Sequence, residues 1–347
     1  MSNPKRHHYV SQMHLKRFAA NPGAPSPTVH TMDIATGKPS RAAVRDEAVI
    51  GQYNRLLPTS AVSPLYVEET LGKLEAAVAQ IFDRIVAGEP LSDEQRVHLA
   101  FFVYLQFQRT PRGRDRTRWI MEQGMTMALA SRLLDSDGTE LSPMPADSAR
   151  EAAQHLLAGG VKVTAGWNAE VLSMFAGCDQ IPLMLLQKMT WVIMRALPDD
   201  MFILCDHPVH IYDPAAPKER SGGWFSSPMV QITMPIDPRA CLLLHPGIST
   251  WREVNSSPEA VRDLNLKTYA SAECRIYGPS QGLLQSIRTD SKRHRDLVAM
   301  FTPRPPGIMV LESHEGGDVP DKVSWMAGDQ HPTIRRFRAD PPTKKTR

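Results

Sequence analysis

The chain has 347 residues, of which 42% are hydrophobic and 22% charged, and its formal net charge is +3. This composition is typical of a soluble globular protein with a sizeable core, and it excludes a disordered chain or a small disulfide scaffold. The four cysteines are scattered without a Cys-x-x-Cys pair, so a reducing cytoplasm is expected rather than a zinc ribbon. Because no long apolar run is present, neither a signal peptide nor a membrane span is expected.

Short elements are expected before residue 60. Residues 5–18 combine a basic start with a small amphipathic segment, and the proline-rich residues 21–27 prevent this segment from continuing as a helix. Residues 29–34 alternate apolar and polar side chains, and Thr36-Gly37-Lys38 is typical of a turn. This pattern predicts a β-hairpin.

Helices are expected between about residues 60 and 180. Ser63-Pro64 is typical of a helix start, and apolar residues follow it at three- and four-residue steps as far as Ile85. A capping box at Ser92–Gln95 opens a second helix, which is apolar nearly all round and ends near Arg109, ahead of a proline. Further helical stretches are predicted at 119–134, after Ser148 and after Asn168.

Strands are expected after about residue 180. Two strand pairs, 190–195 with 201–204 and 231–236 with 240–244, are each predicted around a short turn. The remaining predictions are a helix at 258–270 and a strand at 273–277.

The expected fold class is therefore α+β. A helical N-terminal half, about residues 60–180, is expected to pack on a C-terminal, mainly antiparallel β-sheet, about residues 185–280. One domain is predicted over residues 1–330, followed by a basic, disordered tail at 331–347.

Arginine is concentrated between Arg109 and Arg118, where five arginines accompany a single aspartate. Basic segments of this kind attract phosphate groups, so nucleic acid or a nucleotide is a candidate partner. A solvated surface is the alternative for this segment, and it is the favoured interpretation for the basic tail.

Four polar landmarks resemble those of a known bacterial family. The start of the chain, Arg6–Gln12, resembles the His-His-Tyr-Val-Pro-Gln signature of domain-of-unknown-function family 4238. Three later landmarks are similar to that family as well: Gln106–Pro111, Cys205–Val209 and Pro235–Pro238, the last followed by a helix that contains Asn265. The resemblance spans roughly residues 5–278 and implies a shared fold, but it implies no particular reaction.

The chain departs from the family pattern at three places. Ser11 stands where the signature has proline, Met13-His14 replaces an aromatic pair, and Cys205 replaces serine. Two of these changes lie in the main signature, so a divergent site is expected.

His7 and His8 are the first candidates for chemistry. Adjacent residues point to opposite faces of a strand, so one imidazole is expected to face inward and the other to be solvated. The sharper alternative makes one of them a general base or a metal ligand, because imidazole titrates near neutrality. Gln12, close by in the signature, is a candidate substrate-binding residue.

Four further candidates lie in or after the later landmarks. Arg109, with Gln106 one turn earlier, is predicted either to bind a phosphate or carboxylate or to form a structural salt bridge or helix cap. Asp206 follows an apolar strand, where it would bind a metal, orient a base, stabilise a turn or pair with Arg109. Asn265 completes the candidate substrate-binding set.

The leading functional hypothesis is a phosphoester-directed enzyme, similar to a nuclease or nucleotide hydrolase. In it His7 or His8 is the base, Asp206 orients the histidine or binds a metal, and Arg109 holds the phosphate. A divalent metal is a candidate cofactor. The alternatives are a non-catalytic protein that binds an anion or nucleic acid, and a purely structural network. No Walker A, dinucleotide-binding, nucleophile-elbow or zincin motif is present.

Overall fold

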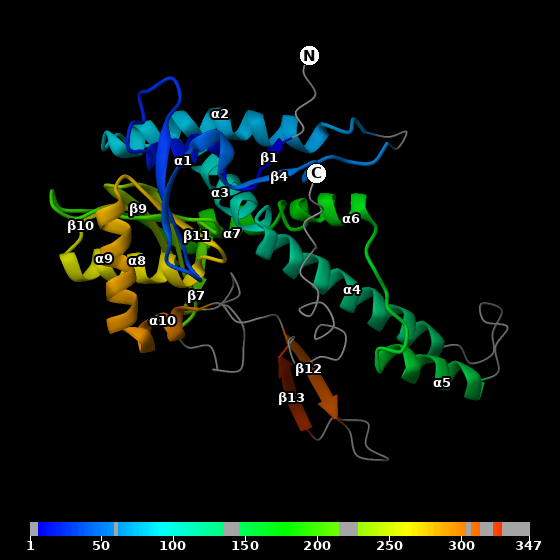
Figure 1. The fold of residues 1–347 in the computed structure, drawn as a ribbon. Coiled ribbons are helices and arrows are strands. Elements are labelled where there is room, and N and C mark those ends of the chain that lie inside the picture. Colours follow the sequence, from blue (N-terminus) through cyan, green and yellow to red (C-terminus); the bar gives the residue numbers. More distant parts are fainter. Residues whose placement is uncertain are drawn as a thin grey trace. The chain divides into compact units, whose positions relative to one another are not determined.

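A computed structural model describes residues 6–58, 62–134, 146–214 and 228–302, together with the backbone of 307–312 and 322–327 (Figure 1). The fold is α+β, with helices mainly in the N-terminal half and sheets mainly in the C-terminal half, which confirms the predicted class. The described residues before 115, of 171–214 and of 228–302 form one compact unit.

The N-terminal segment forms short strands and one short helix. The predicted hairpin is confirmed by the antiparallel pair β2–β3, and β1 pairs antiparallel with β4. Helix α1 (Gln12–Arg17) follows β1 directly, and a 3₁₀ turn (Val44–Asp46) precedes β4. The strands are β1 (Arg6–His8), β2 (Thr28–Asp33), β3 (Pro39–Ala43) and β4 (Val49–Gly51).

Two long helices, α2 (Tyr66–Val86) and α3 (Asp93–Gln108), come next. The predicted capping box is present, because Gln95 N–H donates to Ser92 Oγ and Ser92 N–H donates to Gln95 Oε1. Helix α2 begins at Tyr66 instead of Ser63-Pro64, since Leu56 N–H donates to the Pro64 carbonyl and Leu65 N–H to the Ser63 hydroxyl in a preceding turn.

Helix α4 (Pro111–Leu134) begins earlier than the predicted 119. Proline suits a first helical position, where its missing N–H would have no partner. Thr110 caps the helix by accepting a hydrogen bond from Gly113 N–H at 3.2 Å. Glycine is required there, since a Cβ on Gly113 would lie 2.2 Å from the Phe107 carbonyl oxygen.

A five-stranded sheet has the order β10-β5-β9-β8-β7. The predicted pair around residues 237–239 is confirmed as the antiparallel hairpin β8–β9, whereas the edge strand β10 was not predicted and pairs parallel with β5. The strands are β5 (Met189–Arg195), β7 (His210–Tyr212), β8 (Gln231–Asp237), β9 (Ala240–Pro246) and β10 (Trp251–Asn255).

A second, four-stranded sheet has the order β3-β2-β11-β6, with β6 (Leu204–Cys205) and β11 (Arg275–Gly278). The predicted pairing of 201–204 with 190–195 is therefore wrong. Asn265 is the physical reason: its Oδ1 accepts from Ile203 N–H and its Nδ2 donates to the Met201 carbonyl, which holds this segment against a helix.

Helices cover both sheets of the larger unit. Apolar residues of α2, α3 and α7 (Ile181–Lys188) pack on one face of the five-stranded sheet, and α8 (Pro258–Ser271) packs on the other. Helix α9 (Gln281–Arg293) covers the four-stranded sheet. Helix α10 (Arg295–Phe301) packs against α8.

Helix α1 lies between the two cores. Leu15 and Phe18 are fully buried against residues of the four-stranded sheet, while Met13 packs on the core of the five-stranded sheet.

The smaller unit contains the later part of α4 and α5 (Ala146–Leu157), whose contact is built on Ala130, Ala153 and Leu156. Helix α6 (Trp167–Leu172) follows, leading into a 3₁₀ turn at Ser173–Phe175. Strands β12 (Gly307–Glu312) and β13 (Lys322–Ala327) pair antiparallel. The tail predicted at 331–347 lies outside the described residues. None of the helices described is both long and apolar enough to cross a membrane.

Candidate functional site

The two histidines of β1 divide as predicted. His7 is fully buried, and its Nδ1 accepts a hydrogen bond from Asn54 N–H at 2.8 Å. His8 is half-buried, and its ring lies 3.2 Å from the Arg45 carbonyl oxygen through Nε2 and 3.3 Å from Gln12 Nε2 through Nδ1. His7 is thereby a structural residue, whereas His8 keeps some access to solvent.

His8 is a neutral side chain at pH 7. Burial is the main reason that its pKa lies below the ordinary value, and the charge of Arg109 adds to this effect. The Arg45 carbonyl and the Glu75 carboxylate oppose the shift. In the neutral tautomer that fits both contacts, Nε2–H donates to the carbonyl and Nδ1 accepts from Gln12.

Arg109 and Gln106 hold the backbone of the N-terminal motif. Arg109 Nε and Gln106 Nε2 donate to the Tyr9 carbonyl at 3.0 and 2.9 Å, and Arg109 Nη2 donates to the His8 carbonyl at 3.0 Å. Arg109 Nη1 pairs with Glu75 at 2.5 Å. We call these groups the clasp. The Arg109 side chain is 2% exposed, so the expected phosphate contact has no free surface there, and its carboxylate partner is Glu75 instead of Asp206.

Asp206 holds the start of β11. Its Oδ1 accepts from Glu273 N–H at 2.8 Å, and its Oδ2 accepts from Cys274 and Arg275 N–H at 2.6 and 3.0 Å. Burial raises the pKa of this carboxyl above its ordinary value, while the three N–H groups oppose the shift. The turn role expected for Asp206 was a bond to the backbone next to Pro208, whereas the carboxylate binds the backbone of residues 273–275 instead.

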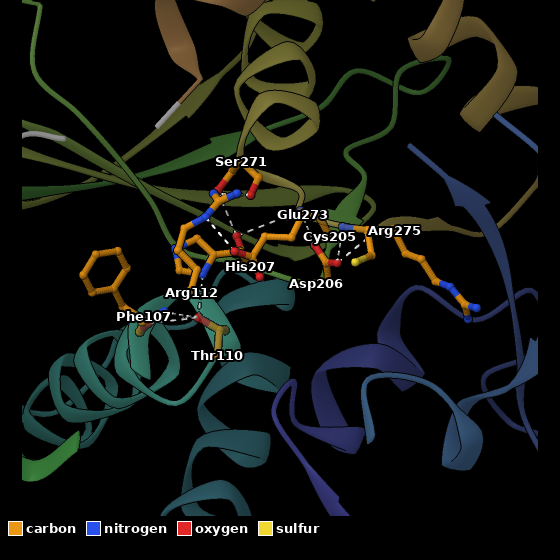
Figure 2. A network of polar contacts seen from close by, with 11 residues as sticks. Phe107, Thr110, Arg112, Cys205, Asp206, His207, Ser271, Glu273 and Arg275 are labelled. Carbon is orange, nitrogen blue, oxygen red and sulfur yellow. Dashed lines mark hydrogen bonds and ion pairs between the residues drawn. The ribbon is translucent and has the colours of Figure 1, made fainter. Parts of the chain in front are cut away.

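Figure 2 shows the network that surrounds Asp206. Thr110 Oγ1 and His207 Nδ1 are 2.6 Å apart, and the Ser271 hydroxyl donates to the His207 carbonyl at 3.1 Å. Arg112 joins the same network by donating to Glu273 and to the Ser271 carbonyl. The network fastens the α3–α4 junction to the ends of β6 and α8. His207 was not predicted as a site residue, although both Thr110 and His207 belong to the family landmarks.

Tyr9 is the point where most of the predicted residues meet. Its carbonyl lies in the clasp, its ring packs edge-on against Tyr53, and the charge of Asp206 helps to raise the pKa of its hydroxyl above the ordinary value, after burial. His8, Gln12, Gln106 and Arg109 thus form one cluster, whereas the Asp206 carboxylate accepts hydrogen bonds from residues 273–275, which lie outside this cluster. Asn265 makes its side-chain hydrogen bonds to the 201–203 segment and is not joined to this cluster.

His14 occupies the position where the family signature has an aromatic residue. It is fully buried, its ring lies 5.3 Å from Phe82 and 6.2 Å from Phe102, and its Nε2 donates to the Pro235 carbonyl at 2.6 Å. Burial lowers the pKa of His14 to about 3. The imidazole therefore fills an aromatic site and also ties α1 to β8.

This burial predicts acid sensitivity that His14→Gln should reduce. The folded-state pKa of about 3 lies below the unfolded value, so the unfolded chain binds the extra proton and stability falls as pH drops below about 6.5. At pH 4 the loss is roughly 3 kcal/mol from this group. Glutamine keeps an N–H donor but does not titrate, so urea unfolding of the variant should show a smaller loss between pH 7 and pH 4. The exposed His155→Gln is the control, and equal pH dependence in both variants would refute the assignment.

A hollow of about 280 Å³ lies beside this cluster. Gln12 and Lys16 are four residues apart, so both side chains project from one face of α1. Arg45 and Lys16 supply the charge, and the backbone carbonyl of Arg45 is also the partner of His8. We call this hollow the α1 pocket. Its lining consists of Gln12, Lys16, Pro22, Ala24, Pro25, Ser26, Pro27, Val44 and Arg45.

The cations of the α1 pocket are available to a ligand. Lys16 is exposed, and in the described part of the chain its ammonium group makes no hydrogen bond or ion pair. Arg45 is 73% exposed, with Nε 3.7 Å from Asp46, a carboxylate that Arg6 already binds at 2.7 Å. A larger, more open hollow of about 470 Å³ also contains arginines, but there Arg195 is paired with Glu253 at 2.7 Å.

The arginine run does not form the expected open basic face. Arg114 is 4% exposed and donates to the Tyr53 carbonyl and to Asn54. Arg112 is bound within the network of Figure 2, and Arg118 pairs with Asp115 at 2.5 Å. The apolar helix that precedes the run brings these arginines next to protein acceptors, which explains the difference from the prediction.

A metal site was also a candidate. Among the residues that the structure describes, no group of three His, Cys, Asp or Glu side chains is placed to hold a metal ion. His7 Nδ1 accepts from Asn54 N–H and lies 3.4 Å from Glu68 Oε1, while the His8 ring contacts the Arg45 carbonyl and the Gln12 amide.

The sequence comparisons agree with the landmarks. A family model described as "Protein of unknown function (DUF4238)" matches residues 6–282, a range that includes the N-terminal motif, both ends of the clasp and Asp206. Comparison with curated proteins and with solved structures found no match. Because the match covers most of the sequence, the chain belongs to the DUF4238 family.

Proposed function

We propose that this chain is a non-catalytic protein that binds a small phosphorylated anion in the α1 pocket. The observation that carries the proposal is the charge of the lining: both charged side chains, Lys16 and Arg45, are cations, and Gln12 stands beside them. Charge-assisted contacts from lysine and arginine to phosphate are among the stronger polar interactions in proteins.

Arg109 and Asp206 already have hydrogen-bond partners within the protein, which supports binding over catalysis. Arg109 and Asp206 are nearly fully buried, and most of their hydrogen bonds go to backbone atoms. A catalytic acid or phosphate clamp needs contact with the substrate. These two residues instead fix the position of β1 and β11, and so of α1.

The proposal predicts that the pocket cations control binding. Inorganic phosphate and ribose 5-phosphate should bind to the wild type in calorimetric titrations, and Lys16→Ala and Arg45→Ala should each weaken binding about tenfold, as expected for losing one charge-assisted contact. Lys73→Ala and Arg252→Ala remove exposed cations elsewhere and should change the affinity less than about twofold. Binding that survives the double variant Lys16→Ala, Arg45→Ala would contradict the proposal.

One observation favours the enzyme hypothesis as a second candidate. His8 is neutral, half-buried and in contact with Gln12, which lines the pocket, so it is the residue best placed to act as a base. Hydrolysis of a nucleotide and nucleic acid panel, with and without divalent metal, decides between the two. Turnover that His8→Asn abolishes while phosphate binding persists would establish the enzyme.

A further inference from the structure

The α1 pocket is larger than a bare oxyanion requires. A water molecule takes about 30 Å³ of liquid, so a tetrahedral phosphate of five heavy atoms displaces roughly two to three waters, about 60–90 Å³. The pocket has a volume of about 280 Å³. Roughly 200 Å³ is therefore left for the part of the ligand that carries the phosphate.

The lining of the pocket is divided between polar and apolar residues. Gln12, Lys16 and Arg45 come from α1 and the 3₁₀ turn, whereas the loop after α1 contributes mainly prolines. Prolyl rings present apolar C–H groups, and the apolar face of a nucleobase can pack against such groups by van der Waals contact. The apolar lining residues are Pro22, Ala24, Pro25, Pro27 and Val44.

The proline loop is held in place without a ligand. Asn21 Oδ1 accepts from both the backbone N–H and the hydroxyl of Thr28, at 2.8 and 3.0 Å, which closes the loop at its base. Ala24 N–H donates to the Asn21 carbonyl at 3.0 Å. A preformed wall lowers the entropic cost of binding, so the loop is suited to select a rigid ligand.

We infer that the ligand is a phosphate monoester that carries one flat ring, of the size of a nucleoside monophosphate, with the phosphate between Lys16 and Arg45 and the ring against the proline loop. This inference rests on the proposed function. Two cations match the charge of a phosphate monoester, about −1.5 to −2, better than that of a carboxylate. The volume of about 280 Å³ lies just below the range usual for ligand pockets, about 300–1,000 Å³, so a dinucleotide would not fit wholly inside the pocket.

Calorimetric titration of the full chain with matched probes tests this inference. At one fixed salt concentration, adenosine and uridine 5′-monophosphate should bind at least about tenfold more tightly than ribose 5-phosphate or inorganic phosphate, since only they contact the proline loop. Ala24→Phe fills the apolar half and should abolish this advantage, so that within this variant the nucleoside monophosphates bind no more tightly than inorganic phosphate. Ala24→Ser leaves the space open and is the matched control.

The outcomes separate the two proposals. Equal affinity for ribose 5-phosphate and the nucleoside monophosphates, or an advantage that persists in Ala24→Phe, would overturn the ring assignment and leave anion binding in place. Absence of binding by every phosphorylated probe would overturn both. Thermal melting of each variant shows that the fold is retained. Pro25→Ala removes apolar contact area from the same loop and gives a second measurement, in which the advantage of the nucleoside monophosphates should also become smaller.

Discussion

Arg109→Met should lower the free energy of unfolding by about 3–5 kcal/mol, the usual cost of removing one partner of a buried ion pair. Methionine fills a similar volume but donates no hydrogen bond. The His8 carbonyl would lose its hydrogen bond from the guanidinium, the Tyr9 carbonyl would keep only Gln106, and Glu75 would be left without its cation. Urea unfolding followed by far-UV circular dichroism measures the change.

Two further variants make this expectation specific to the clasp. Arg109→Lys keeps the charge but cannot reach the three acceptors at once, so its loss should be intermediate. The exposed Arg252→Met should change stability by less than about 0.5 kcal/mol. In hydrogen exchange, Arg109→Met should lose protection selectively in residues 6–17. Wild-type stability in Arg109→Met would show that the clasp does not secure the N-terminal segment.

Asp206→Asn should be costly although it barely changes the shape of the side chain. The two carboxylate oxygens accept hydrogen bonds from three N–H groups. An asparagine has only one acceptor oxygen, so its N–H₂ group would point at one or more of these N–H donors. Leaving a buried donor unsatisfied costs about 1–3 kcal/mol. The neutral amide avoids the burial of charge, which offsets part of the loss, so we expect a net destabilisation of about 1–2 kcal/mol.

The matched control for Asp206 is the exposed Asp199→Asn, which should unfold like the wild type. Asp206→Ala removes all three acceptors and should be at least as destabilising as Asp206→Asn in urea. If Asp206→Asn kept full stability but lost an activity, Asp206 would be a catalytic residue, as the enzyme hypothesis predicts, and not an anchor for β11.

Local sequence patterns predicted the positions of helices and strands better than the pairing of the strands. The Ser92–Gln95 capping box and the 237–239 turn are decided by residues a few positions apart, and both are present. The pairing of residues 201–204 is decided by Asn265, some sixty positions later in the chain. The pattern of residues within the strand gives no sign of this contact, so the predicted partner strand was wrong.

In the candidate site, too, local patterns were predictive and contacts between distant segments were not. Strand alternation was sufficient to predict that one of the two histidines faces inward, but not that it would be His7. A structural salt bridge was among the roles predicted for Arg109, and Glu75 forms it. The partners at His8 and Tyr9 were not predictable, because they are backbone carbonyls, which every residue type provides. The α1 pocket was missed because three separate segments line it, and neither Lys16 nor Arg45 belongs to a motif.

The hydrogen bond between His14 and the Pro235 carbonyl has a consequence for the order in which contacts form during synthesis. The two residues are 221 positions apart, and the ribosome adds about 5–20 residues per second, so α1 waits roughly 10–45 s for this partner to be synthesised. Arg109 is available after less than half of that interval. The clasp can therefore hold the N-terminal motif well before α1 can bond to β8, and Leu15 and Phe18 are fully covered only once Leu204 and Tyr277 have been made.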